Sequence, residues 1–319
     1  MPKSPETVLD LELTSKLTAA EGVSILELRD PSGASLPPWA PGAHIDLVLT
    51  PEITRQYSLC GDPADTEKWS IAVLREPVGR GGSQFVHDKL SQGDRITVRG
   101  PRNHFELEQS PRYVFIAGGI GITPILPMAR AANAAGAEWT LVYGGRSRTS
   151  MAFADTLVDQ YSNRVVIHPE DEYGLIDLAG LLGHSREDTL VYCCGPAPLL
   201  DAVIGHCSTW PRGALHIERF TARPLDEPTR AAGFEVELAL TGITINVTPE
   251  QSILQVVTDA GVQVLSSCEE GTCGTCETAV LAGTVDHRDS LLTDEEKAAN
   301  DTMMICVSRA SCPRLTLDL

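Results

Sequence analysis

The stretch Cys268-Glu-Glu-Gly-Thr-Cys273-Gly-Thr-Cys276 sets three cysteines in the spacing C-x4-C-x2-C, and Cys306 follows after a gap of 29 residues. Two irons bridged by sulfides need four thiolates that converge from one tight loop and one distant segment. This is the plant-type spacing of a [2Fe–2S] ferredoxin. The sequence therefore predicts a metal centre whose ligands are Cys268, Cys273, Cys276 and Cys306.

The residues between these cysteines suit a tight loop around a cluster. Gly271 and Gly274 can take positive φ and bring the backbone close to the metal. The loop amides and nearby hydroxyls could donate hydrogen bonds to the sulfurs and tune the potential. A zinc site is the alternative, but a four-cysteine zinc site usually shows two C-x2-C hooks, and only one is present.

Length and charge narrow the class of protein. A chain of 319 residues is expected to form two or three domains. The net charge of −18 argues against nucleic acid or an anionic membrane surface as a partner. From Phe234 onward, 14 Asp and Glu stand against 4 Lys and Arg. This acidic part could meet a basic protein partner, or it could only confer solubility.

The sequence also indicates the cellular compartment. No apolar run reaches the length of a membrane span, and residues 1–6 lack the apolar core of a signal peptide. The cytoplasm is therefore expected. Reduced thiols, rather than a disulfide framework, are expected at the cysteines outside the metal centre: Cys60, Cys193, Cys194, Cys207 and Cys312.

Residues 1–109 have the pattern of an antiparallel β-barrel, because short alternating or apolar runs are separated by Gly and Pro turns. One helix is expected to start near Ser83 and run through Leu90. The expected strands are Leu9–Leu17, Ser24–Leu28, Ile45–Leu49, Arg55–Leu59, Ser70–Leu74 and Arg95–Arg99.

Residues 110–225 alternate strands with helices, which predicts a doubly wound parallel sheet with helices on both faces. A helix is expected from Ile125 toward Ala135, with Thr123 as its N-cap and Pro124 in its first turn. The other expected elements are strands Tyr113–Ala117, Trp139–Tyr143, Val165–His168 and Thr189–Cys193, and helices Met151–Gln160, Leu178–Leu182 and Leu199–Cys207.

Residues 226–319 are expected to form a small α+β unit that carries the metal centre. The polar segment Thr221–Gly233 contains Pro224 and Pro228 and is expected to link it to the rest of the chain. The pattern predicts strands Glu235–Leu240 and Thr244–Val247. A helix capped by Ser252 and ended by Gly261 should follow.

Two motifs in the barrel favour a flavin. In Arg55-Gln56-Tyr57-Ser58, the aromatic ring and hydroxyl could lie on a flavin ring system, and the arginine could hold a phosphate. Gly79, Gly81, Gly82 and Ser83 precede the expected helix, where free amides and a hydroxyl could cradle a phosphate. An ordinary strand and a glycine-rich hairpin end are the alternatives.

Two further motifs lie at strand ends of the parallel sheet. Gly118-Gly119-Ile120-Gly121 lies between a strand and a helix, where glycines allow a pyrophosphate to approach the backbone. It is not G-x-G-x-x-G, so the usual dinucleotide fingerprint does not apply. Cys194-Gly195-Pro196 ends a later strand, where open α/β sheets bind ligands; a buried structural cysteine is the alternative.

Taken in this order, the motifs closely resemble the phthalate dioxygenase reductase and vanillate demethylase reductase family of the ferredoxin–NADP reductase superfamily. The resemblance covers nearly the whole chain. It implies a flavin barrel, a pyridine-nucleotide domain and a C-terminal plant-type ferredoxin domain of β-grasp fold. It further implies an enzyme that passes electrons from NADH through FMN and the cluster to a terminal oxygenase, either a Rieske oxygenase or a cytochrome P450.

The resemblance also implies roles for particular residues. Arg55, Gln56, Tyr57 and Ser58 would lie on FMN, Gly82 and Ser83 at its phosphate, and Ala72, Val73 and Leu74 along its ring. Tyr57, Ser58, Cys194, Glu218 and Phe220 would meet near flavin and nicotinamide. The coenzyme would contact Gly118, Gly119, Gly121, Thr123, Pro124, Cys194, Gly195 and Pro196, with Arg146 near the adenosine ribose. NADH is implied, although Arg146 and Arg148 could also pair with the 2′-phosphate of NADPH. A monomer is expected.

Two other functions fit parts of the pattern. The FAD-containing electron-transfer subunit of a dihydroorotate dehydrogenase belongs to the same superfamily, but its last cysteine would come sooner. A non-catalytic sensor could use flavin and cluster as a switch, but an output domain is not evident in the sequence.

Overall fold

The computed structural model describes residues 7–225, 227–230 and 232–319. The chain divides into two compact units, Met1–Phe220 and Thr221–Leu319. The first holds a six-stranded antiparallel sheet and a five-stranded parallel sheet, and the second holds a five-stranded sheet with a small two-stranded one.

The antiparallel sheet is a barrel in the order β4-β3-β6-β1-β2-β5. A bridge between Leu59 and Ile71 joins its two outer strands. Alternate side chains such as Leu11, Leu13 and Val98 are fully buried inside, which is the period of two that a half-buried strand requires. Its elements are β1 (Val8–Ala20), β2 (Val23–Arg29), β3 (His44–Thr50), β4 (Ile53–Ser58), β5 (Trp69–Leu74), α1 (Gly82–Asp88) and β6 (Arg95–Arg102).

The parallel sheet runs β11-β10-β7-β8-β9. Its strands are β7 (Arg112–Gly118), β8 (Glu138–Gly145), β9 (Val165–Pro169), β10 (Thr189–Cys194) and β11 (Leu215–Glu218). Its helices are α2 (Ile122–Ala134), α3 (Ala154–Tyr161), α4 (Glu170–Tyr173), α5 (Leu178–Leu182) and α6 (Ala197–His206), with the short turns η1 (Gly119–Gly121), η2 (Arg148–Ser150) and η3 (Cys207–Thr209).

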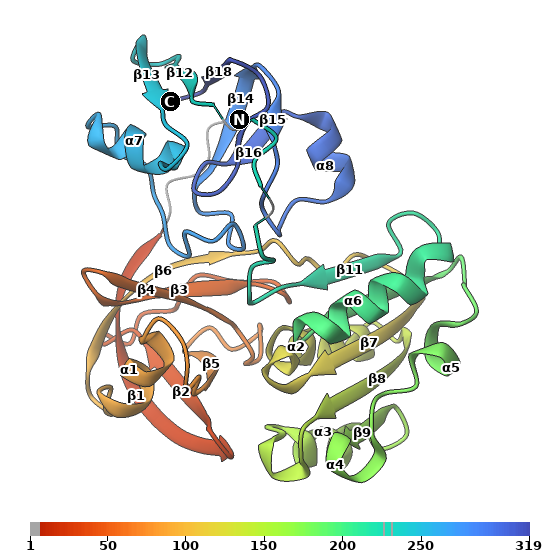
Figure 1. Cartoon of the computed structure of the whole chain (residues 1–319). Helices are drawn as coiled ribbons and strands as arrows, with labels where there is room; N and C mark the ends of the chain where they lie inside the picture. Colours follow the sequence, from red (N-terminus) through yellow and green to blue (C-terminus); the bar gives the residue numbers. More distant parts are fainter. Residues whose placement is uncertain (1–6, 226, 231) are drawn as a thin grey trace. The chain divides into compact units, whose positions relative to one another are not determined.

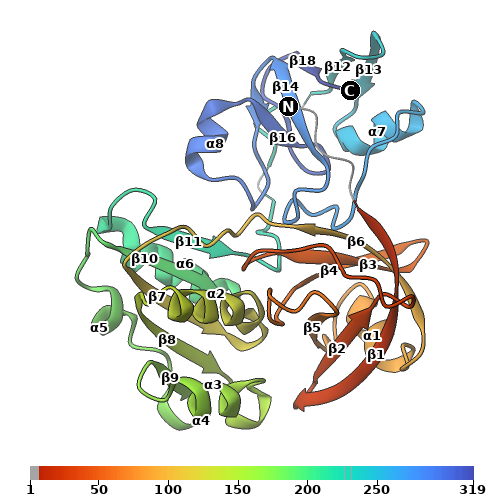
Figure 2. The same ribbon diagram turned by 180° about the vertical axis from the view of Figure 1, so that it is seen from behind.

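Both faces of this sheet are covered, and β7 shows why. Phe115 packs into the core that contains α2, whereas Val114 and Ile116 pack into the core that contains α5 and α6. Successive side chains of a strand point to opposite faces, so an almost wholly buried β7 needs helices on each side. Figures 1 and 2 show α2 and α6 on opposite faces, which confirms the doubly wound prediction.

The second unit has its own core around Phe234, Val236, Met303 and Leu315. Its sheet runs β13-β12-β18-β14-β16, with β15 and β17 paired separately. Its elements are β12 (Phe234–Leu238), β13 (Ile243–Val247), α7 (Ile253–Asp259), β14 (Glu277–Ala282), β15 (Val285–Asp286), α8 (Asp294–Ala299), β16 (Thr302–Met304), β17 (Arg309–Ala310) and β18 (Arg314–Leu317). Ser252 caps α7 as predicted, by accepting a hydrogen bond from the Gln255 amide.

Two predicted helix starts are wrong. Helix α2 begins at Ile122, so Thr123 lies inside it and donates its hydroxyl to the Ile120 carbonyl instead of acting as N-cap. The reason is η1, which leads directly into α2 and leaves no extended residue for a cap. Helix α3 begins at Ala154 because Phe153, at φ 64°, takes a left-handed turn before it.

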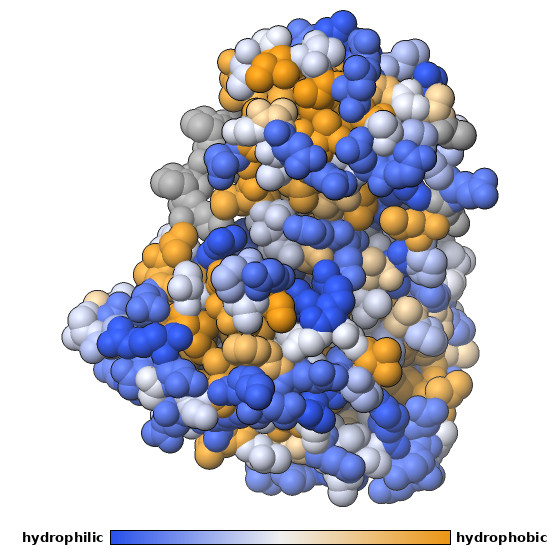
Figure 3. Space-filling view, turned by 60° about the vertical axis from the view of Figure 1, so that its left-hand side comes forward, coloured by the Kyte–Doolittle hydropathy of each residue, from blue (hydrophilic) through white to orange (hydrophobic). Residues whose placement is uncertain are grey.

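Among the residues that the structure describes, none of the helices has both the length and the apolarity to cross a membrane. The face drawn in Figure 3 mixes hydrophilic with hydrophobic side chains.

Candidate active site and cluster loop

The seam between β4 and β5 brings two predicted flavin segments together. The Leu59–Ile71 bridge and the hydrogen bond from the Cys60 amide to the Ser70 carbonyl (2.9 Å) join the two strands. Ser58 and Ala72 flank this bridge, and both are buried. The segments Arg55–Ser58 and Ala72–Leu74 therefore lie along one seam of the barrel.

Arg55 is fixed against the glycine-rich loop. Its guanidinium donates to the carbonyls of Thr54 (2.8 Å) and Arg80 (2.7 Å). A Cβ at Gly82 would lie 2.3 Å from Cγ of Arg55, so only glycine allows this approach. The loop folds back on itself, with the Ser83 hydroxyl accepting from the Glu76 amide at 3.0 Å. No local pattern in the sequence indicates that the Arg80 carbonyl holds Arg55.

Two neighbours of Arg55 have properties that suit a bound ring. The side-chain amide nitrogen of Gln56 is buried and has no hydrogen-bond partner among the described residues, so it is a donor that a ligand could use. Burial raises the pKa of Tyr57 well above its ordinary value, so the phenol stays neutral. A neutral aromatic ring is what stacking on a flavin requires.

The two glycine motifs of the parallel sheet touch each other. Strands β7 and β10 pair in parallel with Ala117 opposite Cys194, so both motifs lie at the carboxyl edge of the sheet. A Cβ at Gly121 would lie 2.3 Å from the Cys194 carbonyl oxygen, and one at Gly118 would lie 2.6 Å from Cδ of Pro196. The absence of a side chain at Gly118 and Gly121 is therefore required for the close packing of the two loops.

Gly119 differs from both of these glycines. Its φ is +55°, and no described atom lies within 4 Å of where its Cβ would be. Its backbone is therefore open on that side, as the approach of a pyrophosphate requires. Of the three motif glycines, Gly119 is the one with open space at its Cβ position, so a ligand could approach its backbone there.

Ser58, Cys194 and Glu218 come together from three strands. Glu218, at the end of β11, lies opposite Cys194 in the parallel ladder, and its carboxylate accepts from the Cys194 thiol at 3.9 Å. Burial raises the pKa of Glu218 to about 8, against hydrogen bonds from Cys194 and Ser58 that oppose the rise. Burial also raises the pKa of Cys194, so its thiol stays protonated. The site therefore holds a mostly protonated carboxyl at neutral pH, able to donate a proton or a hydrogen bond.

The residue after Glu218 holds this segment in place. Arg219 has a side chain only 3% exposed and pairs with Asp201 of α6 at 2.7 Å. Successive strand side chains point to opposite sides, so this anchor keeps Glu218 turned toward Cys194. Phe220, predicted for the same site, is 43% exposed. Sequence reasoning missed Arg219, although it stands between two residues singled out for the site.

The arginines after β8 are not equivalent. Arg148 forms an ion pair with Asp155 of α3. Arg146 is exposed, and its carbonyl accepts from the Asp171 amide of α4 at 3.1 Å. The acidic residues of α4, Glu170, Asp171 and Glu172, follow directly after β9.

In the second unit the four predicted ligand cysteines are all buried and form two pairs. The thiols of Cys268 and Cys273 are hydrogen-bonded to each other, and so are those of Cys276 and Cys306. Hydrogen bonding from Cys273 lowers the pKa of Cys268 to about 5, and hydrogen bonding from Cys306 lowers that of Cys276. Two pairs of cysteines are what two bridged irons require, since each iron takes two cysteine ligands.

The loop geometry fits the same centre. Gly271 (φ 71°) and Gly274 (φ 74°) take the predicted left-handed turns, and so does Glu269 at φ 57°. The Glu270 amide donates to the Cys268 sulfur at 3.3 Å, and the Thr275 amide to the Cys273 sulfur at 3.5 Å. Four cysteines in the plant-type spacing, with amides that donate to their sulfurs, fit [2Fe–2S] better than zinc.

Comparisons with known proteins agree with a cluster site in the second unit and a coenzyme site at the parallel sheet. Residues 236–311 match the family model of the 2Fe-2S iron-sulfur cluster binding domain, and residues 115–204 match that of the oxidoreductase NAD-binding domain. Phthalate dioxygenase reductase of Burkholderia cepacia is 40% identical over 316 residues, which cover 98% of this chain and 97% of that protein. The chain belongs to the phthalate dioxygenase reductase family.

Other similar proteins are named as parts of oxygenase systems. The phenoxybenzoate dioxygenase subunit beta of Ectopseudomonas oleovorans is 45% identical over 94% of each chain. The solved phthalate dioxygenase reductase matches with a TM-score of 0.72 over 98% of each chain. An intact type IV self-sufficient cytochrome P450 monooxygenase matches with a TM-score of 0.93 and 44% identity. That match covers 98% of this chain and 41% of the other, so this chain spans about two fifths of that protein.

Family membership confirms the class of reaction. The chain is an NADH-dependent oxidoreductase of the oxygenase reductase type, which carries electrons toward a terminal oxygenase. The matches support FMN, NADH and a [2Fe–2S] cluster as its cofactors.

The contact between the two coenzyme loops gives a testable prediction. Replacement of Gly121 by Ala should raise KM for NADH at least about tenfold, because the added methyl group displaces the Cys194 carbonyl from the site, a change of about 1.4 kcal/mol in binding. Gly205→Ala is the matched control, since no described atom lies within 4 Å of its Cβ position in α6. Steady-state kinetics on both variants would decide, and equal KM values would contradict the prediction.

Proposed function

We propose that the meeting point of Ser58, Cys194 and Glu218 is where hydride passes from NADH to FMN. The observation that carries this proposal is that three residues from β4, β10 and β11 converge beside the flavin seam and the coenzyme loops. When bound, FMN would accept the two electrons of a hydride and release them one at a time, and the cluster would carry single electrons. The chain's residues bind and orient the two cofactors and exclude water from between them.

We assign the flavin to the seam of the barrel. The FMN phosphate would be held by Arg55 together with Gly79, Gly81, Gly82 and Ser83. The guanidinium of Arg55 is planar and always charged, and it lies beside a loop whose close approach only glycine permits. Tyr57 would stack on the ring, with Ala72, Val73 and Leu74 along it. The unpaired amide of Gln56 would donate to a ring oxygen or nitrogen.

We assign the coenzyme to the carboxyl edge of the parallel sheet. The open backbone at Gly119 would receive the pyrophosphate, with Thr123 and Pro124 at the start of α2 and Gly195 and Pro196 opposite. Arg146 would lie near the adenosine ribose. The acidic residues of α4 would disfavour a 2′-phosphate beside it, which supports NADH over NADPH.

Glu218 would act as a proton or hydrogen-bond donor during flavin reduction, with Cys194 and Phe220 shaping the site. Replacement of Glu218 by Gln should lower the rate constant for flavin reduction by NADH about 10–100-fold, because the amide cannot release a proton. Flavin content should not change. Stopped-flow flavin bleaching measures this rate, with the exposed Glu187→Gln as control. A wild-type rate would remove Glu218 from this role.

The flavin itself can be identified directly. Acid-released cofactor should be FMN, because one phosphate suffices for the Arg55 and Gly82 site. Chromatography of the released flavin against FMN and FAD standards checks this. Recovery of FAD alone would contradict the assignment and favour the dehydrogenase-subunit alternative.

We propose that the three domains are 1–109, 110–225 and 226–319, with the four cysteines as the ligands of the cluster and a monomer as the working form. The relatives that support a terminal oxygenase include both dioxygenase reductases and cytochrome P450 fusions. A Rieske oxygenase and a cytochrome P450 would both take electrons from the same cluster. Measuring turnover with an oxygenase of each class would show which of the two is the acceptor.

A further inference from the structure

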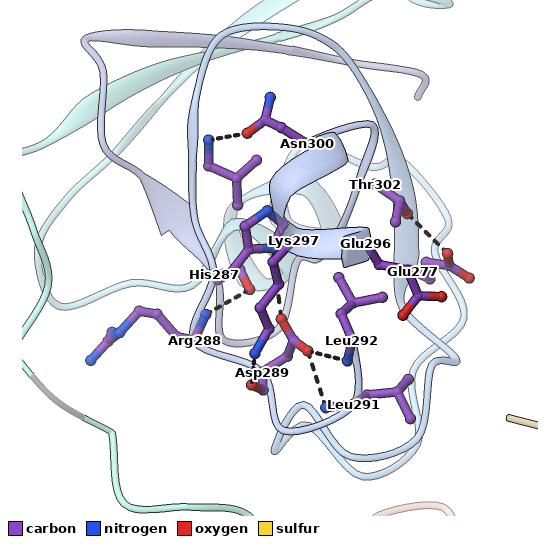
Figure 4. Close-up of polar contacts among 12 residues, drawn as sticks. Glu277, His287, Arg288, Asp289, Leu291, Leu292, Glu296, Lys297, Asn300 and Thr302 are labelled. Atoms are coloured by element: carbon purple, nitrogen blue, oxygen red, sulfur yellow. Dashed lines mark hydrogen bonds and ion pairs between the residues drawn. The ribbon is translucent and has the colours of Figure 1, made fainter. Parts of the chain in front are cut away.

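Asp289 has a wholly buried carboxylate in the loop between β15 and α8. Its Oδ1 accepts hydrogen bonds from the amides of Leu291 (3.1 Å) and Leu292 (2.7 Å), which closes a tight turn (Figure 4). The ammonium group of Lys297 donates to the Asp289 carbonyl at 3.1 Å and ties this turn to α8. The His287 ring lies 3.8 Å from Oδ2.

The same turn packs directly against the cluster loop. The amide of Ser290 donates to the Gly271 carbonyl at 2.9 Å. A Cβ at Gly271 would lie 3.1 Å from Cα of Asp289 and 2.5 Å from a methyl group of Val307, so the glycine is wedged between the two segments.

A second contact ties the turn to the segment of the distant ligand. The Arg288 amide donates to the Ser308 hydroxyl at 3.2 Å, and the side chain of Ser308 is buried two residues after Cys306. Residues 287–292 therefore touch both segments that supply thiolates, the loop 268–276 and the segment around Cys306.

We propose that Asp289 is a positioning residue for the iron–sulfur centre, which acts by holding the loop 268–276 against the segment around Cys306. Hydrogen bonds from amides to the sulfurs, such as those from Glu270 and Thr275, stabilise the more negative, reduced cluster and so raise its potential. Loss of the turn would let the loop move away from the Cys306 segment, weaken these hydrogen bonds and open the cage. The inference depends on the cluster and its four cysteine ligands, not on the role proposed for Glu218.

The proposed role depends on the Asp289 oxygen that accepts hydrogen bonds from the amides of Leu291 and Leu292. Two substitutions at Asp289 should therefore differ in their effect. Asp289→Asn keeps that oxygen, whereas Asp289→Ala removes it. On the intact holoprotein, Asp289→Ala should release iron to a chelator about tenfold faster and shift the cluster midpoint potential to more negative values, as loss of an outer-shell partner does. Asp289→Asn should stay within about twofold of wild type in iron release. Asp259→Ala, an exposed aspartate at the end of α7, is the control.

The outcomes separate cleanly. A wild-type rate and potential in Asp289→Ala would overturn the proposal, and so would an Asn variant as impaired as the Ala variant. Should Asp289→Ala fail to fold, Ser308→Ala removes the acceptor of Arg288 at the other end of the same turn. It should release iron about two- to fivefold faster with a more negative potential, and wild-type behaviour there would refute the positioning role.

Discussion

Replacement of Cys306 by Ser should abolish the cluster and lower reduction of a terminal oxygenase at least about 100-fold, a difference of about 2.7 kcal/mol. The hydroxyl is a poor substitute for a soft thiolate on iron, and Cys306 is the only ligand outside the loop 268–276. Reduction of ferricyanide by NADH should persist, since the flavin and coenzyme sites lie in the unit Met1–Phe220.

Iron content and the EPR signal of the reduced protein measure the loss. Cys312→Ser is the matched control, because it makes the same substitution in the same unit. The Cys312 sulfur accepts from the Thr284 amide (3.1 Å) and donates to the carbonyls of Thr284 (3.6 Å) and Arg314 (3.0 Å), which a serine hydroxyl could also do. Wild-type iron and signal in Cys306→Ser would remove Cys306 from the ligand set.

A chain truncated after Arg230 should fold and keep NADH-dependent ferricyanide reduction within about tenfold of the intact protein, or ~1.4 kcal/mol. It keeps the three hydrophobic cores of the unit Met1–Phe220, including the one shared by the barrel and the parallel sheet. It lacks all four cluster ligands, so reduction of a terminal oxygenase should fall at least about 100-fold.

Paired assays with ferricyanide and with the oxygenase check this result. A truncated protein that reduced the oxygenase as fast as the intact chain would show that electrons leave by another route. Loss of both activities, with circular dichroism showing an unfolded chain, would instead contradict the independence of the first unit.

Much of the fold followed from local pattern. The strands of the barrel and strands β7 to β10 of the parallel sheet were predicted within a few residues. Alternation along Leu11 and Leu13 and the unbroken apolar run of β7 are properties of short segments. The cluster loop was equally accessible, since spacing and glycines are written in the sequence.

What the sequence missed depends on partners that are distant in the chain. Strand β11 is short and only partly buried, and its place beside β10 comes from pairing alone. The Arg219–Asp201 pair and the Asp289 turn likewise need tertiary contacts. Helix α8 is different, because Thr293 and Glu296 form a capping box whose T-x-x-E signature is visible in the sequence.

The central claim is that electrons from NADH reach the acceptor by way of the flavin and then the cluster. The most direct test mixes the intact protein anaerobically with NADH and follows flavin absorbance and the freeze-quenched EPR signal of the cluster. We predict that flavin bleaching precedes the EPR signal, and that the signal forms at least as fast as turnover with the oxygenase. A signal that forms more slowly than turnover, or before the flavin is reduced, would contradict this order.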